Sequence, residues 1–268
     1  MTFRIKNVTD VTRMGLLRPY SPRNDEVLCY THPAMAFTVT LVKKTPVTSS
    51  VTAFYFAKPQ GFIFQPGQFI NLEIPVTDCD NRCNKRNFSV AAAPFERYLM
   101  IAIRNGTSRF KQTLQDLPVG TEVKLVGPMG RFVLNEEVTQ PAAMLTGGIG
   151  ITPLFSMLKH ATHEHLKKPL TLIFSNKSQS DIPFKTELDE LDRKNDFLTI
   201  HHTLTDDETW GGHKGRIDEQ VIKKLIRNWQ SAEYYLCGPM AMVEELKAAL
   251  LQMQIPDELV KFEQFTGY

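Results

Sequence analysis

The chain has 268 residues, of which 42% are hydrophobic and 22% charged, and its formal net charge is +2. This length suffices for one large domain or two of ordinary size. The small net charge creates no field that attracts nucleic acid or anionic lipid, so we expect neither as a partner. We find no apolar run of about 18 residues, which a membrane span needs. Because the first ten residues also lack the apolar core of a secretory signal, we expect a cytoplasmic protein.

The metal-ligating residue types do not form a recognisable site. The four cysteines are Cys29, Cys79, Cys83 and Cys237, too few for a disulfide scaffold in a chain of this size. Cys79 and Cys83 are separated by three residues, but a zinc or iron–sulfur site needs about four ligands, and no second close pair exists. A cluster of three histidines, His160, His163 and His165, lacks the HExxH pattern and is expected on the solvated end of a helix. We therefore predict no metal site.

The first half of the chain has the short apolar periodicity of β-strands. Six segments rich in Val, Ile, Phe and Thr are separated by Gly, Pro, Asn and Asp, at residues 36–44, 51–59, 67–75, 86–94, 99–106 and 121–128. Such a series predicts a closed or nearly closed antiparallel barrel over residues 36–139. One helix is expected at residues 108–117, where Phe110, Leu114 and Leu117 have helical spacing. Residues 1–35 show no clear period and are expected to extend the barrel.

The second half, residues 140–268, alternates between strand-like and helix-like patterns. Strands are expected at residues 142–147, 170–175, 197–204 and 233–238. Between and after them, apolar residues at helical spacing predict helices near residues 154–161, 221–229 and 242–253. This alternation is typical of a parallel sheet covered by helices, and we place the boundary near Gln140–Pro141.

A glycine-rich turn joins the first of these strands to the first helix. It contains Thr146, Gly147, Gly148, Gly150, Thr152 and Pro153. Phosphate groups bind at such a strand-to-helix turn, because the free N–H groups and the dipole of the helix point toward it. Thr152 is expected to cap the helix, and Pro153 suits its first turn. The fingerprint G-x-G-x-x-G is only half present, since Pro153 replaces the third glycine. A purely structural turn is the alternative.

The end of the second parallel strand lacks the acidic residue that usually binds the ribose of NAD. Ser175, Asn176 and Lys177 stand there instead. Ser175 and Lys177 have the chemistry to hold a 2′-phosphate, so the sequence favours NADPH over NADH, without separating them firmly.

Four motifs occur in a characteristic order along the chain: "RNFS" at residues 86–89, "GPMGRF" at 127–132, "TGGIGITP" at 146–153 and "CGPM" at 237–240. In this order they resemble the ferredoxin–NADP reductase superfamily, and the similarity extends from about Ala36 to Tyr268. The resemblance implies an antiparallel Greek-key β-barrel that binds FAD, followed by a Rossmann-like parallel-sheet domain that binds NADP or NAD.

The resemblance also implies roles for residues of the barrel. Arg86 would hold the flavin diphosphate, Ser89 would hydrogen-bond N5 of the isoalloxazine, and Phe88 would line the ring in place of the more common Tyr. The loop before the predicted helix would close on a second phosphate, for which simple helix capping by Ser108 is the alternative. Two phosphate sites favour FAD over FMN. The full set of barrel contacts expected is Arg86, Asn87, Phe88, Ser89, Ile103, Gly106, Thr107 and Ser108.

In the second half, the resemblance places Cys237 near C4 of the nicotinamide, with Gly238, Pro239 and Met240 beside it. The alternative for Cys237 is a buried small residue. Near the C-terminus an aromatic residue, Tyr268 or else Phe265, would cover the flavin, and Glu263 would be the nearby acid; a frayed terminus is the alternative.

Together these residues predict a flavoprotein oxidoreductase in which Ser89, Cys237 and Glu263 are catalytic. It would pass hydride or electrons between NAD(P)H and a separate carrier, ferredoxin or flavodoxin, because no cysteine set for a fused iron–sulfur cluster exists in the sequence. Two alternatives stay open: the reductase component of an oxygenase system, and a non-catalytic regulatory subunit that binds flavin or nucleotide.

Overall fold

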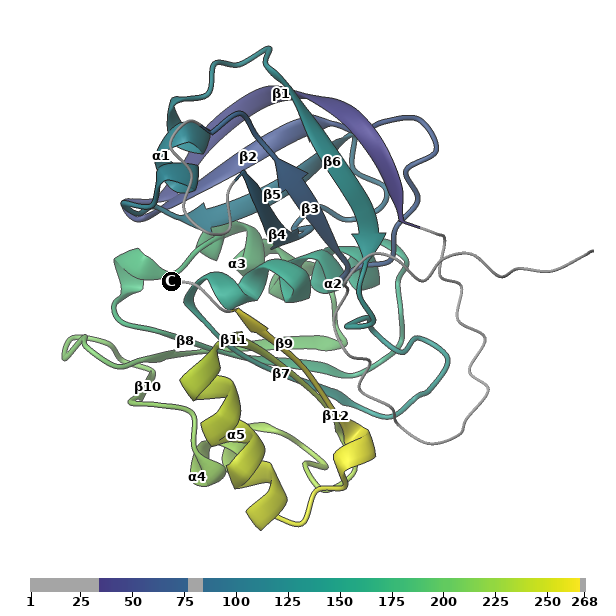
Figure 1. The fold of residues 1–268 in the computed structure, drawn as a ribbon. Coiled ribbons are helices and arrows are strands. Elements are labelled where there is room, and N and C mark those ends of the chain that lie inside the picture. The colour runs from purple at the N-terminus through teal and green to yellow at the C-terminus, as the bar shows by residue number, and fades with distance from the viewer. Residues whose placement is uncertain (1–33, 77–83, 266–268) are drawn as a thin grey trace, which may run out of the picture. The chain divides into compact units, whose positions relative to one another are not determined.

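The computed structural model describes residues 34–76 and 84–265 (Figure 1). All of these belong to one compact unit, His32–Tyr268. The predictions for residues 1–33, Cys79, Cys83 and Tyr268 lie outside the described residues. No helix of the described part is long and apolar enough to span a membrane.

The first sheet is antiparallel, with strand order β4-β3-β6-β1-β2-β5. Its strands are β1 (Met35–Thr48), β2 (Val51–Ala57), β3 (Phe69–Glu73), β4 (Lys85–Ser89), β5 (Tyr98–Arg104) and β6 (Glu122–Met129). The two ends of this order approach each other just beyond β4, where the N–H of Ala91 donates to the carbonyl of Met100 at 2.8 Å. The predicted six-stranded antiparallel barrel is therefore confirmed.

The alternating sequence explains how these strands pack. In β6, Val123 and Leu125 are buried while their neighbours Glu122 and Lys124 are exposed. Successive side chains of a strand point to opposite faces. With this alternation, the apolar side chains point into the barrel interior and the polar ones point outward. β1 pairs with β6 in the register Val39↔Val123, which joins apolar positions of the two strands.

Helix α1 (Arg109–Asp116) lies between β5 and β6, where the sequence predicts it. Phe110 and Leu114 are buried in the barrel core. Ser108 is the N-cap, and its hydroxyl accepts a hydrogen bond from the N–H of Lys111 at 3.4 Å. Ser108 therefore caps the helix, which was the alternative expected from sequence. Its side chain lies at the start of α1.

The second sheet is parallel, with strand order β10-β9-β8-β7-β11-β12. Its strands are β7 (Ala142–Gly147), β8 (Leu170–Asn176), β9 (Leu198–Leu204), β10 (His213–Lys214), β11 (Glu233–Pro239) and β12 (Val260–Phe265). The chain moves outward from β7 through β8 and β9 to β10 and then crosses to β11 on the other side of β7. This reversal between β7 and β11 is the topological switch point at which open α/β sheets bind ligands, beyond the carboxyl ends of the strands.

Helices cover both faces of the parallel sheet, as Figure 1 shows. They are α2 (Ile151–His163), α3 (Lys185–Lys194), α4 (Glu219–Leu225) and α5 (Met240–Gln252). Residues of β8 alternate between two cores: Leu172 and Phe174 pack with α2 and α3, whereas Ile173 packs with α4 and α5. The predicted Rossmann-like arrangement is thus confirmed, and this second sheet begins just after Pro141.

Three elements of the second half were missed from sequence. α3 has a largely charged sequence, KTELDELDRK, with Leu188 as its only buried residue. β10 has two residues, and β12 comes from the segment that we expected to be a tail. Each has too few buried apolar positions to produce a clear period, and tertiary pairing decides its structure.

The histidine cluster at the end of α2 is less solvated than expected. The His160 side chain is only 16% exposed, and its Nε2 lies 3.2 Å from a carboxylate oxygen of Glu136. The His163 ring stacks on Phe95, with ring centroids 3.9 Å apart. Solvation was therefore the wrong expectation for His160. Among the described residues, no group of three or more His, Cys, Asp or Glu is arranged to hold a metal ion.

A buried ion pair fixes the start of the parallel sheet to the segment that precedes it. Lys168 and Glu233 are 4% and 5% exposed, and the Nζ of Lys168 lies 2.9 Å from Oε2 of Glu233. Lys168 also donates to the carbonyl of Val138 at 3.0 Å. A second ammonium, that of Lys261, lies 3.6 Å from the same carboxylate. The pair thus ties the segment between the two sheets to the amino ends of β8 and β11.

Replacing Glu233 with Gln should destabilise the protein strongly. The change keeps the side-chain shape but leaves the Lys168 ammonium buried without a counter-charge, which costs roughly 3–5 kcal/mol. Urea unfolding monitored by circular dichroism would measure the free energy of unfolding. Glu137→Gln, at an exposed position of the same segment, is the matched control and should change it by less than about 0.5 kcal/mol. Equal midpoints for the two variants would show that the ion pair contributes nothing.

Candidate active site

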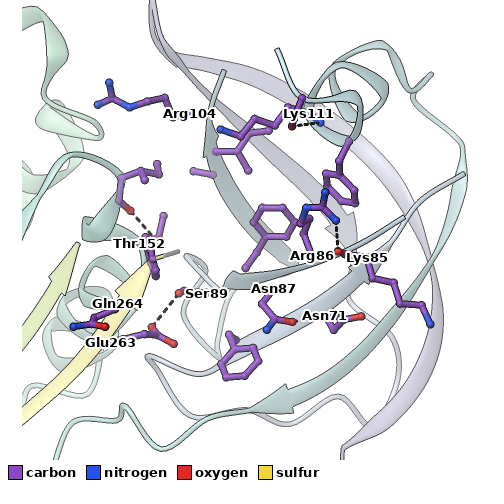
Figure 2. A pocket seen from close by; sticks show the side chains of 18 residues that line it. Asn71, Lys85, Arg86, Asn87, Ser89, Arg104, Lys111, Thr152, Glu263 and Gln264 are labelled. Carbon is purple, nitrogen blue, oxygen red and sulfur yellow. Dashed lines mark hydrogen bonds between the residues drawn. The ribbon is translucent and has the colours of Figure 1, made fainter. Parts of the chain in front are cut away.

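A cavity of about 510 Å³ opens where the edge of the barrel meets the turn before α2 and the end of β12 (Figure 2). Strands β4 and β5 and helix α1 supply most of its wall. Its lining residues are Phe69, Asn71, Lys85, Arg86, Asn87, Phe88, Ser89, Ala102, Ile103, Arg104, Ser108, Phe110, Lys111, Ile149, Thr152, Glu263, Gln264 and Phe265.

The charges of this cavity favour an anionic ligand. Among the described residues, four cations line it, Lys85, Arg86, Arg104 and Lys111, against the single carboxylate of Glu263. Partial burial lowers the pKa of Lys111, and the nearby charge of Arg104 lowers it further. Cations held so close that they disfavour one another's charge bind a polyanion well, because the anion relieves their repulsion.

Arg86 is held in place by its surroundings. Its Nη1 donates to the carbonyl of Lys85 at 2.7 Å, and its guanidinium carbon lies 5.1 Å from the centre of the Phe110 ring. Phe88 lies beside that ring, with the two centroids 5.8 Å apart. A stacked guanidinium is pre-oriented for the forked hydrogen bonding that phosphate oxygens accept. Arg86 thus lies beside an aromatic wall that offers a flat apolar surface to a ring system.

Ser89 and Glu263 connect the barrel to the last strand of the parallel sheet. The Ser89 hydroxyl donates to Oε2 of Glu263 at 3.2 Å, shown as a dashed line in Figure 2. Burial raises the pKa of Glu263 to about 7, and the hydrogen bond from Ser89 opposes that rise. Near neutral pH this carboxyl group therefore exchanges readily between its protonated and ionised forms. A group with this pKa, at the wall of a cavity, can hold or release a proton.

The glycine turn packs tightly against the end of β11. A Cβ atom on Gly150 would lie 2.6 Å from the carbonyl oxygen of Cys237, so no larger residue fits without a shift of the backbone. Gly148 has φ +55°, and a Cβ there would lie 3.3 Å from Nη2 of Arg104. The cation at the end of β5 therefore reaches the turn itself. Because α2 begins at Ile151, its free N–H groups point toward the same region.

Thr152 does not cap α2, contrary to the sequence-based expectation. The N-cap is Gly150, which has no side chain, and the Thr152 hydroxyl donates instead to the carbonyl of Ile149 at 3.1 Å. The helix begins earlier than expected because the turn tightens into a short 3₁₀ segment, Gly148–Gly150. Pro153 lies in the first turn of α2, as predicted.

Cys237 lies at the carboxyl end of β11, next to the glycine turn. Its side chain is fully buried, and burial, with the nearby Glu263 charge, raises the pKa of its thiol well above the usual value. Its carbonyl accepts a hydrogen bond from the Thr146 hydroxyl at 2.8 Å. Gly238, which follows, has φ +151°. The thiol is therefore neutral and packed, and it does not line the cavity in this arrangement.

The structure brings together many of the residues expected to contact a cofactor. Arg86, Asn87, Phe88, Ser89, Ile103, Ser108, Thr152, Glu263 and Phe265 all line the cavity. Gly106 and Thr107 are exposed and do not line it. Ser175 pairs with Gly147 across the parallel sheet, which places residues 175–177 beside the glycine turn.

Sequence reasoning missed several residues that line the cavity, above all Lys85, Arg104, Lys111 and Phe110. Arg104 and Lys111 stand on either side of the Gly106–Ser108 turn. Their positive charge around a strand-to-helix turn was a signal of anion binding that the sequence contained. Phe110 was assigned only to the barrel core.

The chain is similar to several known proteins. Residues 144–248 match the family model of the oxidoreductase NAD-binding domain. The chain is 26% identical over 240 residues to flavohemoprotein A of Dictyostelium discoideum, covering 83% of this chain and 58% of that protein. It is 27% identical over 246 residues to the ferredoxin–NAD(P)(+) reductase component of the naphthalene 1,2-dioxygenase system of Pseudomonas putida, covering 91% and 73%.

Solved structures show the same fold. The FAD/NAD-binding domain of nitric oxide dioxygenase from Vibrio cholerae O1 biovar El Tor superposes with a TM-score of 0.76 at 22% identity, covering 85% of this chain and 98% of that one. A ferredoxin–NADP⁺ reductase from Neisseria gonorrhoeae with bound FAD and NADP gives a TM-score of 0.73 at 18% identity, with coverage of 85% and 98%.

The chain therefore shares the fold of these two solved structures, and residues 144–248 resemble an oxidoreductase NAD-binding domain. The resemblance drawn from the four sequence motifs is confirmed. The chain spans 56–60% of the length of several flavohemoproteins that it matches.

The raised pKa of Glu263 predicts a pH dependence of stability. In the folded protein the pKa is about 7, against 4.5 for an ordinary Glu. This group therefore contributes stability that is fully present below pH 4.5 and is lost as the pH rises through 7, on the order of 3 kcal/mol at about 1.4 kcal/mol per pKa unit. Glu263→Gln should lose less stability than the wild type between pH 4.5 and 8, as measured by urea unfolding. Parallel pH profiles for the two proteins would contradict the raised pKa.

Ser89→Ala should raise the pKa of Glu263 further, because the hydroxyl hydrogen bond stabilises the ionised carboxylate. The carboxyl ¹³C resonance of Glu263, followed through a pH titration by NMR, would report this change. A pKa that stays the same or falls in this variant would mean that the hydrogen bond does not favour the ionised form.

Proposed function

We propose that the protein is a flavin-dependent oxidoreductase that passes electrons between NAD(P)H and a separate one-electron carrier. One observation supports this above all others: a cationic, aromatic cavity containing the Ser89–Glu263 pair lies next to the glycine turn of an NAD-binding domain. A flavin and a nicotinamide nucleotide each combine a flat ring with a negatively charged diphosphate. The cavity and the turn offer the complementary surfaces at one place.

The residues of the cavity fit FAD. Its volume of about 510 Å³ is within the range of roughly 300–1,000 Å³ for ligand pockets. Arg86 and the start of α1, with Lys111 beside it, provide two positions for phosphate groups, which supports FAD over FMN. Phe88 and Phe110 provide the apolar wall for an aromatic ring, and Ser89 provides a hydroxyl at the inner end.

Bound flavin would supply the capacity to take up hydride from a nicotinamide nucleotide and to release electrons one at a time. The residues of the chain would bind and orient the flavin and exclude water from it. In our proposal Ser89 orients the reactive ring, Glu263 holds or moves a proton beside Ser89, and Phe265 covers the ring from the side of β12. The free N–H groups at the start of α2 bind the nucleotide phosphates. Gly238 and Pro239 leave room for the nicotinamide beside Cys237.

We propose ferredoxin or flavodoxin as the first class of electron carrier. An oxygenase system is the second candidate, supported by the similarity to the Pseudomonas putida reductase component, of which the chain covers 73%. A cytoplasmic location stays a prediction from sequence.

The decisive experiment is anaerobic reduction. The purified protein should be yellow and should bleach when NADH or NADPH is added, and colour should return when the physiological class of carrier is supplied. Addition of ferredoxin, flavodoxin or an oxygenase component would identify that class. A colourless protein that binds nucleotide without turnover would support a regulatory subunit and overturn the proposed reaction.

Arg86→Ala should weaken flavin binding by roughly thirtyfold or more, because truncating one partner of a close charge pair costs about 2 kcal/mol or more. The flavin content after purification and the dissociation constant from fluorescence titration would measure this loss. Arg97→Ala is the matched control, since Arg97 stacks on Tyr98 and does not line the cavity. Full colour in the Arg86 variant would contradict the proposed position of the diphosphate.

A further inference from the structure

A second cavity, of about 360 Å³, lies between the barrel and helices α2 and α3. Strands β2 and β5 and the segment between β4 and β5 form one wall, and α2 and α3 form the other. It shares no lining residue with the cavity that contains Arg86. Its volume is within the range of roughly 300–1,000 Å³ for ligand pockets. The chain therefore has a second cavity of ligand size, for which the proposed electron transfer has no use.

Aromatic side chains form much of the wall of this second cavity. Tyr55, Phe95, Phe155 and Phe184 line it, and the rings of Phe155 and Phe184 stack with their centroids 4.5 Å apart. Phe184 has a left-handed backbone conformation, with φ 57°, which a bulky residue rarely adopts. Such a conformation costs free energy and persists only where the surrounding structure holds it. The Phe184 ring is therefore fixed in the wall by its packing on Phe155.

The charged side chains of the second cavity leave one carboxylate without a counter-charge. The ammonium of Lys159 pairs with the carboxylate of Glu96. The ammonium of Lys194 pairs with the carboxylate of Glu190 at 3.1 Å. Glu187 also lines the cavity, but it makes no hydrogen bond or ion pair with any residue in the part of the chain that the structure describes.

The ammonium of Lys159 is already occupied by its neighbours. Its side chain is only 12% exposed, and its Nζ lies 4.5 Å from the centre of the Phe155 ring. Its partner Glu96 is held in place by a further hydrogen bond, from the N–H of Ala93. Because a carboxylate and an aromatic ring both contact this ammonium, it is poorly placed to attract an anionic ligand.

The charge of Glu187 acts on groups inside the second cavity. Burial lowers the pKa of Lys159, and the negative charges of Glu96 and Glu187 oppose that fall. Burial also raises the pKa of the Tyr55 hydroxyl, and the charges of Glu187 and Glu96 raise it further. Lys159 belongs to α2 and Tyr55 to β2, so the field of Glu187 reaches both walls.

We propose that the second cavity binds a small organic cation, with its ammonium group beside Glu187 and its apolar part against Tyr55, Phe95 and Phe184. A carboxylate beside aromatic rings favours a cation for two reasons, because the carboxylate and the faces of the rings are both negative. An anion would be repelled by Glu187, and a neutral molecule would gain only the apolar contacts. The site uses neither flavin nor nicotinamide nucleotide, so this inference does not depend on the proposed function.

Calorimetric titration with benzyltrimethylammonium tests the site directly. The wild-type protein should bind one equivalent of this cation. Benzyl alcohol and benzoate, a neutral and an anionic probe that each carry the same aromatic ring, should bind more weakly. Failure of the cation to bind, or tighter binding of benzoate, would overturn the inference.

Two pairs of variants locate the bound cation. Glu187→Gln should weaken its binding about fivefold, as expected for a partly exposed charge pair, whereas Asp196→Asn, at an exposed position outside the cavity, should not change it. Phe95→Leu keeps an apolar side chain but removes the ring, and it should weaken binding about threefold. Its control is Phe197→Leu, which changes an exposed phenylalanine outside the cavity. Equal dissociation constants for the Glu187→Gln and Asp196→Asn proteins would overturn the proposed site.

Discussion

The first two turns of helix α2 are buried on all sides, and the position of the glycine turn depends on that burial. From Ile151 to Leu158 each residue is buried, because the parallel sheet covers one face of the helix and the barrel covers the other. The Ser156 hydroxyl donates to the carbonyl of Ala92 in the barrel at 2.5 Å. A helix that is enclosed in this way cannot shift without exposing apolar surface or breaking a buried hydrogen bond. The glycine turn at its start is therefore held rigidly beside the cavity.

Because the site is rigid, the cations of the cavity are held in position before an anion binds. Arg86 is oriented by Phe110 and the Lys85 carbonyl, and Arg104 lies against Gly148. Cations that are already in place when an anion arrives lose little conformational entropy on binding it, which is the advantage of a preorganised site. The barrel and the glycine turn thus share one cationic region, suited to two ligands that both carry phosphate.

The edge strand β12 adds an acidic group, the carboxyl of Glu263, to a cavity that is otherwise lined by cations. It pairs with β11 in the register Cys237↔Glu263, which places the Glu263 carboxyl beside Ser89 of the barrel. The same burial that raises its pKa to about 7 keeps water from stabilising the charged form. A proton-exchanging group is thereby located at the junction of the two sheets, where the proposed transfer of hydride would need it.

Apart from α3, β10 and β12, the sequence alone indicated the order of the strands and helices, because alternating apolar residues and glycine turns are local signals. It also indicated Arg86, Ser89 and the glycine turn, whose motifs are contiguous. Only the tertiary structure decided that β12 is a strand, that Arg104 and Lys111 line the cavity, and that Asp207 lies against the loop that follows β8. Each of these depends on contacts between residues far apart in the chain, such as Ser89 with Glu263. No local pattern contains that information, since strand pairing and helix burial bring such residues together only when the core forms.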